Sequence, residues 1–150
     1  MTQEQKELLL KDLCARLPYG VKVHVKNWSG LIMEWIENDY VVKSAFPSLN
    51  EVHVQSESGS LNVILGYDDY EFKPYLFPLS SMTEEQKEYI SNRWGINDEF
   101  NFEINPDWGE YSISYIEAQE YIEWLKENHF DDRRMIEKGL AIDATNLNIY

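Results

Sequence analysis

The sequence has little of what usually marks a secreted or membrane protein. It contains a single cysteine, Cys14, which excludes an internal disulfide and suits a reducing compartment. No stretch approaches the roughly 18 consecutive apolar residues that a membrane-spanning helix needs. The N-terminus carries charges where a secretion signal would have its apolar core. We therefore expect a cytoplasmic protein that does not enter a membrane.

The sequence also lacks the short motifs that indicate common catalytic and binding sites. There is no Gly-x-Gly-x-x-Gly or Walker loop for phosphates, no His-Glu-x-x-His zinc motif and no Gly-x-Ser-x-Gly nucleophile turn. Bases are scarce, because 13 Lys and Arg stand against 27 Asp and Glu, for a net charge of −14. A phosphate backbone would be repelled by such a chain. We predict no catalytic residues, no cofactor and no direct binding of nucleic acid.

The excess negative charge lies in the later part of the chain. Residues 1–50 hold six acids and six bases, whereas residues 67–132 hold seventeen acids and four bases. This asymmetry predicts an acidic outer face on the C-terminal part. A partner that contacts this face would be basic.

The composition is that of a folded protein. Hydrophobic residues make up 43% of the 150 residues and aromatic residues 14%, which supplies enough apolar area for a core. A chain of this length without a low-complexity linker is most simply one domain. We predict a single domain over 1–150, with an N-terminal helix and a barrel-like part in 1–80 and an acidic helix and hairpin part in 81–150.

Alternation of apolar and polar residues dominates 20–77. Val21, Val23 and Val25 face one way between polar neighbours, which is typical of a half-buried strand. Five or six short strands separated by turns, one of them at Asn38-Asp39, predict a small curled β-sheet or an SH3-like barrel.

Three segments begin with a capping box, a Ser or Thr followed three residues later by Gln or Glu. The pairs are Thr2 with Gln5, Thr83 with Gln86 and Ser114 with Glu117, and they predict helices over 2–17, 83–94 and 115–128. A hairpin around Pro106–Gly109 and a short last helix from Asp131 to Gly139 complete an α+β fold. The residues expected in the core are Leu9, Leu13, Val23, Val25, Tyr121, Ile122 and Leu125.

Three strings carry a resemblance to known sequences. They are Leu17-Pro-Tyr-Gly-Val-Lys-Val23, then Phe72-Lys-Pro-Tyr-Leu76 with the following 78–83, and Asn128-His-Phe-Asp131 with the following 136–141. With these strings the chain resembles a family of short uncharacterised proteins from Bacteroides-type gut bacteria and their phages or mobile elements. The resemblance implies a cytosolic bacterial or phage origin and no particular chemistry.

Histidine and cysteine offer few candidates for a site. His24 and His53 sit on the polar sides of predicted strands and could share a cation if the strands were neighbours, but two ligands are too few for zinc. We therefore predict no metal. His129 is placed to cap a helix C-terminus, and Cys14 lies on an apolar helix stripe as an inert buried thiol.

The aromatic residues are more suggestive. Trp124 lies off the apolar stripe of its predicted helix and close to Glu117, Glu120 and Glu127, which together form a candidate interaction face. The alternative is that the tryptophans fill seams between the sheet and the helices.

These observations favour a non-enzymatic, acidic protein-interaction module of mobile-element or phage origin, with a basic protein as partner. Two alternatives stay open. One is a nucleic-acid mimic that inhibits a protein handling DNA or RNA, and the other is a small hydrolase whose site combines carboxylates and histidines.

Overall fold

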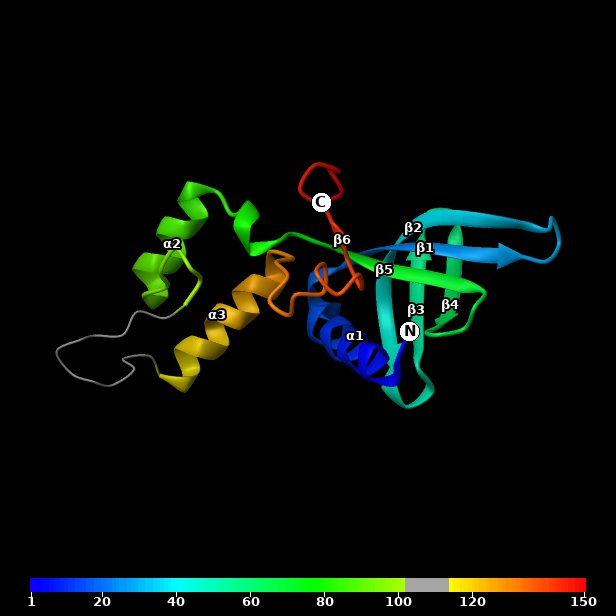
Figure 1. Cartoon of the computed structure of the whole chain (residues 1–150), viewed down its shortest axis with the longest axis horizontal. Helices are drawn as coiled ribbons and strands as arrows, with labels where there is room; N and C mark the ends of the chain where they lie inside the picture. Colours follow the sequence, from blue (N-terminus) through cyan, green and yellow to red (C-terminus); the bar gives the residue numbers. More distant parts are fainter. Residues whose placement is uncertain (102–113) are drawn as a thin grey trace.

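The structure is a computed structural model that describes residues 1–101 and 114–150. Its described helices are α1 (Gln3–Arg16), α2 (Glu84–Trp94) and α3 (Tyr115–Glu127). Its described strands are β1 (Lys22–Ser29), β2 (Glu34–Phe46), β3 (Glu51–Ser56), β4 (Gly59–Ile64), β5 (Tyr70–Leu76) and β6 (Ile142–Asp143). The molecule is elongated, with the sheet and α1 at one end and α2 and α3 at the other (Figure 1).

The three predicted helices are confirmed, and each begins with its capping box. The side chains of Thr2, Thr83 and Ser114 each accept a hydrogen bond from the backbone N–H three residues on. Gly95 ends α2 with a φ of 66°, a left-handed conformation that glycine adopts without strain. Local sequence therefore fixes where these helices start.

The α+β prediction is confirmed, with a six-stranded mixed sheet in the order β4-β3-β2-β1-β5-β6. The sheet is consistent with a curled arrangement but is not closed into a barrel, so the SH3-like alternative is not confirmed. The first five strands pair antiparallel with their neighbours, and the short β6 adds parallel to β5. The predicted turn at Asn38-Asp39 is wrong, because both residues pair with β1 and β2 continues through them.

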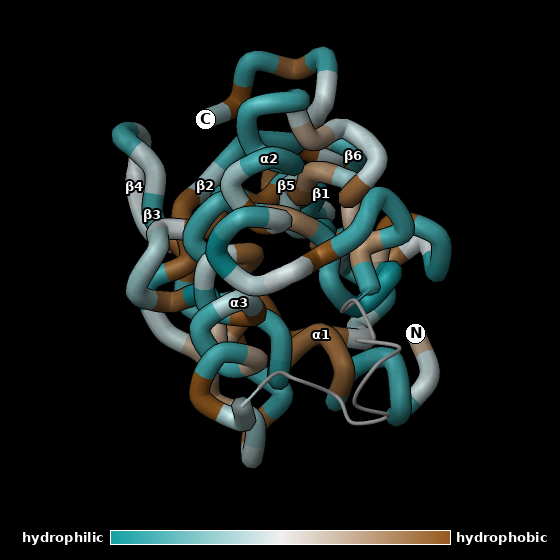
Figure 2. The backbone as a smooth tube through the Cα atoms, turned by 90° about the vertical axis from the view of Figure 1, so that its left-hand side faces the viewer, coloured by the Kyte–Doolittle hydropathy of each residue, from teal (hydrophilic) through white to brown (hydrophobic). Residues whose placement is uncertain are grey.

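One hydrophobic core lies between α1 and the sheet. Leu9 and Leu13 of α1 pack with Val23 and Val25 of β1, and all four are fully buried, as predicted. Figure 2 shows the hydrophobic stretch of α1 in brown. Cys14, on the same helix, is only half-buried, so the prediction of a buried thiol is wrong.

A second core joins α2 to α3 and is rich in aromatic residues. Tyr121 and Leu125 of α3 are buried there with Ile90 and Trp94 of α2. Ile122 was expected in this core, but 45% of it is exposed. It lies about 100° around the helix from Tyr121, outside the stripe that α2 covers.

The predicted last helix is wrong, because residues 132–133 and 135–139 form turns instead. Asp131 does act like a cap, since its carboxylate accepts hydrogen bonds from the N–H groups of Met135 and Ile136, both at 2.8 Å. Arg134, however, has a φ of 55°, which a right-handed helix cannot contain. The predicted hairpin around Pro106–Gly109 lies outside the described residues. Within the described ranges we find no helix with the length and apolar character needed to cross a membrane.

Candidate functional site

The sheet extends into a hairpin that projects from the body of the molecule. β5 pairs with β1 only as far as Asn27, and β3 pairs with β2 only from Val41 onward. We call residues 28–40 the arm. Its outer part, residues 28–35, has neither β3 nor β5 paired beside it, whereas residues 36–40 pair with the part of β1 that β5 also pairs with, and only their other edge lacks a strand. Figure 1 shows the β1–β2 hairpin extending away from the helices.

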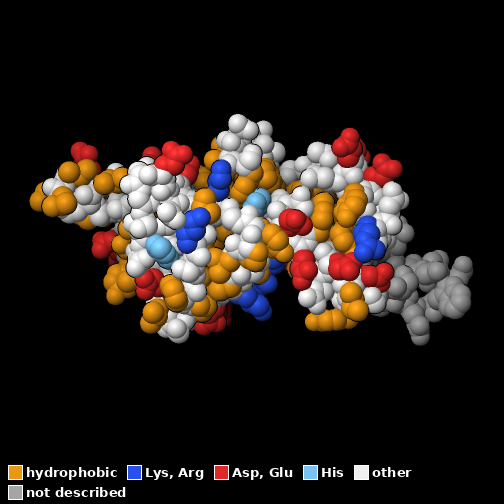
Figure 3. Space-filling model, turned by 180° about the vertical axis from the view of Figure 1, so that it is seen from behind, with side chains coloured by type: hydrophobic (Ala, Val, Ile, Leu, Met, Phe, Trp, Pro, Cys, Tyr) orange, Lys and Arg blue, Asp and Glu red, His pale blue; other side chains and the backbone are white. Residues whose placement is uncertain are grey.

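The arm exposes large apolar side chains. Leu31 is 98% exposed and Met33 is 76% exposed, and both lie in the turn that joins β1 to β2. The exposed apolar residues of the arm are Trp28, Leu31, Ile32, Met33, Trp35 and Ile36. Hydrophobic side chains crowd the projecting end in Figure 3. A contiguous patch of this kind marks an interaction site more often than a solvated surface.

Contacts within the arm hold it in shape. Trp28 lies directly opposite Trp35, and their rings meet edge to face with centroids 5.8 Å apart. The ammonium group of Lys26 lies 5.6 Å from the Trp35 ring centroid. In the turn, the N–H of Met33 donates to the carbonyl of Ser29 at 2.8 Å. These contacts keep the hairpin ordered while its apolar tip faces solvent.

One edge of the arm is open. Among the residues that the structure describes, no strand pairs with residues 34–40 on the side away from β1. This edge carries three acids, Glu34, Glu37 and Asp39, and no base. At its base lies a pocket of about 490 Å³ whose lining includes Lys43, Gln55, Ser56 and Glu57. An unpaired edge is a template for pairing with another chain.

A histidine and two carboxylates meet on the sheet face opposite α1. Asp39 lies 3.0 Å from Nδ1 of His24 and accepts a hydrogen bond from the Tyr75 hydroxyl at 2.7 Å. Glu37 approaches Nε2 of the same ring at 3.8 Å. Burial and the hydrogen bond to Asp39 raise the pKa of Tyr75, so its hydroxyl stays protonated. A histidine oriented by a carboxylate can serve as a general base.

The structure does not bring the two suspected metal ligands together. His24 lies on β1 and His53 on β3, and β2 separates these strands. Within residues 1–101 and 114–150, no group of three or more His, Cys, Asp or Glu side chains is arranged to hold a metal ion.

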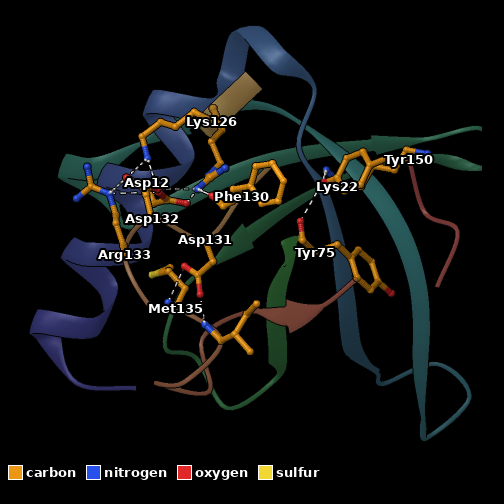
Figure 4. A network of polar contacts seen from close by, with 12 residues as sticks. Asp12, Lys22, Tyr75, Lys126, Phe130, Asp131, Asp132, Arg133, Met135 and Tyr150 are labelled. Carbon is orange, nitrogen blue, oxygen red and sulfur yellow. Dashed lines mark hydrogen bonds and ion pairs between the residues drawn. The ribbon is translucent and has the colours of Figure 1, made fainter. Parts of the chain in front are cut away.

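Buried charges connect α1, α3 and the segment after α3. We call this group the ionic junction, and its members are Asp12, Arg16, Lys126, Asp132 and Arg133. Figure 4 labels Asp12, Lys126, Asp132 and Arg133 of this group. The Asp12 carboxylate lies 2.7 Å from Nε of Arg16 and 3.0 Å from Nζ of Lys126. Arg16 also donates to the carbonyl of Phe130 at 2.7 Å. Burial alone would raise the pKa of Asp12, but the charges and hydrogen bonds of Arg16 and Lys126 lower it overall.

The candidate interaction face on α3 is partly engaged within the chain. Trp124 is half-buried, stacks on Phe130 at 5.8 Å and contacts Tyr89 at 5.7 Å between ring centroids. The carboxylate of Glu120 pairs with Arg93 at 2.9 Å. Trp124 therefore fills a seam between elements.

The two other acids of this face differ. Hydrogen bonds from Ser114 hold Glu117 in its capping box and lower the pKa of Glu117, whereas Glu127 is exposed. That Glu117, Glu120, Trp124 and Glu127 form an interaction face stays a prediction.

His129 does not cap α3. The side chain of Asn128 donates to the carbonyl of Trp124 at 2.9 Å instead, and the His129 ring stacks on Tyr150 with centroids 3.8 Å apart. Burial, with the nearby charges of Arg16 and Lys22, lowers the pKa of His129 to about 4. The ring is therefore neutral at pH 7 and has a packing role.

Sequence reasoning missed both the arm and the ionic junction. The one signal for the arm was the run Leu31-Ile32-Met33 after Gly30, which lacks the alternation of a half-buried strand. The junction gave no signal, because Asp12 and Lys126 lie 114 residues apart. No protein family, curated protein or solved structure matches this chain.

Proposed function

We propose that this chain is a non-enzymatic protein-interaction module that binds its partner through the arm. The single observation that carries the proposal is the exposure of six large apolar side chains on an ordered, projecting hairpin. Transfer of a side chain such as Leu31 from water into an interface contributes roughly 1.5–3 kcal/mol to association. A partner that covers the arm tip would account for the exposure of these apolar side chains in the isolated chain.

The charge of the chain supports a basic partner. A net charge of −14 repels nucleic acid and anionic lipid surfaces, and it attracts a basic protein at low salt. We place this function in the cytoplasm, where the single free Cys14 would stay reduced. The mobile-element or phage origin belongs to the same proposal and depends on the sequence resemblance alone.

A capture experiment with matched variants tests the proposal. The arm variant combines Leu31→Ser, Ile32→Ser and Met33→Ser, and its control combines Tyr115→Ser, Ile116→Ser and Ile122→Ser on α3. All six residues are exposed, so both variants should keep the melting temperature of the natural chain. The immobilised natural chain and the α3 control should retain the same protein from a lysate of the source organism. The arm variant should lose at least nine tenths of it, and equal retention by all three would contradict the proposal.

The group around His24 favours a second candidate, a small hydrolase. Asp39 could orient the imidazole while His24 removes a proton from a bound water or hydroxyl group. His24→Ala should then abolish turnover of a panel of simple ester and phosphate substrates, whereas His53→Ala, on the other side of β2, should not. Turnover that both variants retain, or its absence in the natural chain, would remove this candidate.

A further inference from the structure

We infer that the partner engages the arm as an extended, basic segment that adds a strand to the open edge of β2 at residues 34–40. This inference rests on the proposed function and goes further, because it names the chemistry of the bound segment and its mode of binding. Addition of a strand to a sheet edge gives affinity through main-chain hydrogen bonds and specificity through alternate side chains.

The backbone of the arm is ready for such pairing. In the described chain, β2 pairs with β1 along Glu34–Val41 and with β3 only from Val41 to Phe46. Residues 34–40 form an edge roughly 20 Å long, at about 3.3 Å per residue. A strand added here would lie in line with β3, whose last residue is Ser56. Its end would reach the pocket that Lys43, Gln55 and Ser56 help to line.

The side chains along this edge specify a basic occupant. Trp35, Glu37 and Asp39 alternate along one face of β2, and Glu34 and Ile36 lie on the other. An added strand with Lys or Arg opposite Glu37 and Asp39, and an apolar residue opposite Trp35, would form favourable cross-strand pairs. Residues 34–40 include no base, and on the β1 side Lys26 lies opposite Glu37 and His24 opposite Asp39, so a base on an added strand would share these acids with β1.

The same charges disfavour a second copy of the chain as the occupant. Antiparallel pairing of two β2 edges about residue 37 would place Glu37 opposite its own copy and Asp39 opposite Trp35. Parallel pairing would also bring like acids side by side. Like charges directly opposite each other destabilise a sheet, and acids on an edge are a common device against self-association.

Synthetic peptides test the inference directly. The probe is a nine-residue peptide that alternates lysine and valine, and its control has the same sequence with alternate backbone amides N-methylated. The control keeps every charge and side chain but loses hydrogen bonds along one edge. We expect the probe to bind the natural chain at least tenfold more tightly than the control, and to slow hydrogen exchange at amides within 34–40.

Charge-reversal variants locate the contact. Glu34→Lys with Glu37→Lys should weaken binding of the probe at least tenfold. Glu123→Lys with Glu127→Lys changes the net charge equally on α3 and should weaken it no more than about twofold. All four glutamates are exposed, so melting curves should show both variants folded.

Equal binding of the N-methylated control, protection outside 34–40 or equal weakening by both charge reversals would overturn the inference. Such a result leaves the proposed function standing if the arm-tip variant still loses its partner from lysate. If that variant retains its partner, the proposed function is wrong, whatever the result of the peptide-binding measurements.

Discussion

The ionic junction and the arm differ in what they bury: the junction buries charged side chains, and the arm exposes apolar ones. At the junction, Asp12 and Arg16 are fully buried and Lys126 is 4% exposed, although charged groups prefer water. On the arm, Leu31 and Met33 face solvent, although apolar groups avoid it. The junction has its partners within the chain, since each buried charge is paired or hydrogen-bonded there. Within residues 1–101 and 114–150, nothing buries the arm tip in this way.

The comparison separates residues that hold the fold from residues that are available to a partner. Arg16 of α1 and Lys126 of α3 both reach Asp132, so the junction links the two ends of the molecule. Loss of one of these charges leaves another buried without its partner, which is costly. An almost fully exposed side chain at the arm tip, such as Leu31, has little contact with the described part of the chain, so its loss should cost the isolated fold little.

The largest effect is expected at the centre of the junction. Asp12→Ala should lower the free energy of unfolding by about 3–5 kcal/mol, because Arg16 and Lys126 would remain buried with their charges uncompensated. Urea denaturation measures this loss. The double variant Asp12→Leu with Lys126→Met removes a charge of each sign and should cost less. An equal or greater loss in the double variant would show that packing, not charge, dominates this site.

A smaller loss is expected in the aromatic core. Trp124→Ala should lower the free energy of unfolding by about 2–4 kcal/mol, below the upper range for large-to-small changes because Trp124 is only half-buried. Trp124→Phe keeps an aromatic ring against Phe130 and should recover part of the loss. Thermal melting compares the two variants. A melting temperature unchanged by Trp124→Ala would return Trp124 to the candidate interaction face.

Acidification should lower the stability of the folded chain through protonation of His129. The pKa of His129 falls from its usual 6.5 to about 4 in the folded chain, so the folded state favours the neutral ring. Its contribution is complete above pH 6.5 and is lost as the pH falls toward 4. After allowance for solvent around a half-buried ring, the loss is about 1–2 kcal/mol.

The matched variant for this pH effect is His129→Phe, which keeps a ring against Tyr150 but cannot be protonated. Denaturation curves at pH 7 and pH 4 should show a smaller acid loss in the variant than in the natural chain. Identical pH dependence of the two chains would assign the acid sensitivity to other groups.

The smallest effect on stability is expected at the arm tip. Leu31→Ser should change the free energy of unfolding by less than about 0.5 kcal/mol, because the side chain is almost fully exposed. Val25→Ser, on the buried part of the same strand pair, is the control and should cost several-fold more. A loss at Leu31 comparable to that at Val25 would mean that the tip packs against something within its own chain.

Local sequence patterns predicted the structure correctly where the residues that interact are also close together in the sequence. The capping boxes at Thr2, Thr83 and Ser114 and the alternation of Val21, Val23 and Val25 predicted the helix starts and the first strand. The prediction of a last helix from Asp131 failed at Arg134, whose left-handed backbone interrupts a right-handed helix, and the next residue, Met135, is buried in the core. A capping residue alone does not make a helix continue.

The sequence by itself determined the helix starts, the strand-rich region from 20 to 77 and the acidic charge, because each depends on residues a few positions apart or on composition. Tertiary structure alone decided which polar residues are buried and which apolar residues are exposed. Asp12 and Lys126 become a buried pair only when α1 packs near α3, and residues 28–40 become an arm only because β3 and β5 stop pairing where they do. Burial depends on contacts between distant segments, so no periodicity within one segment could reveal it.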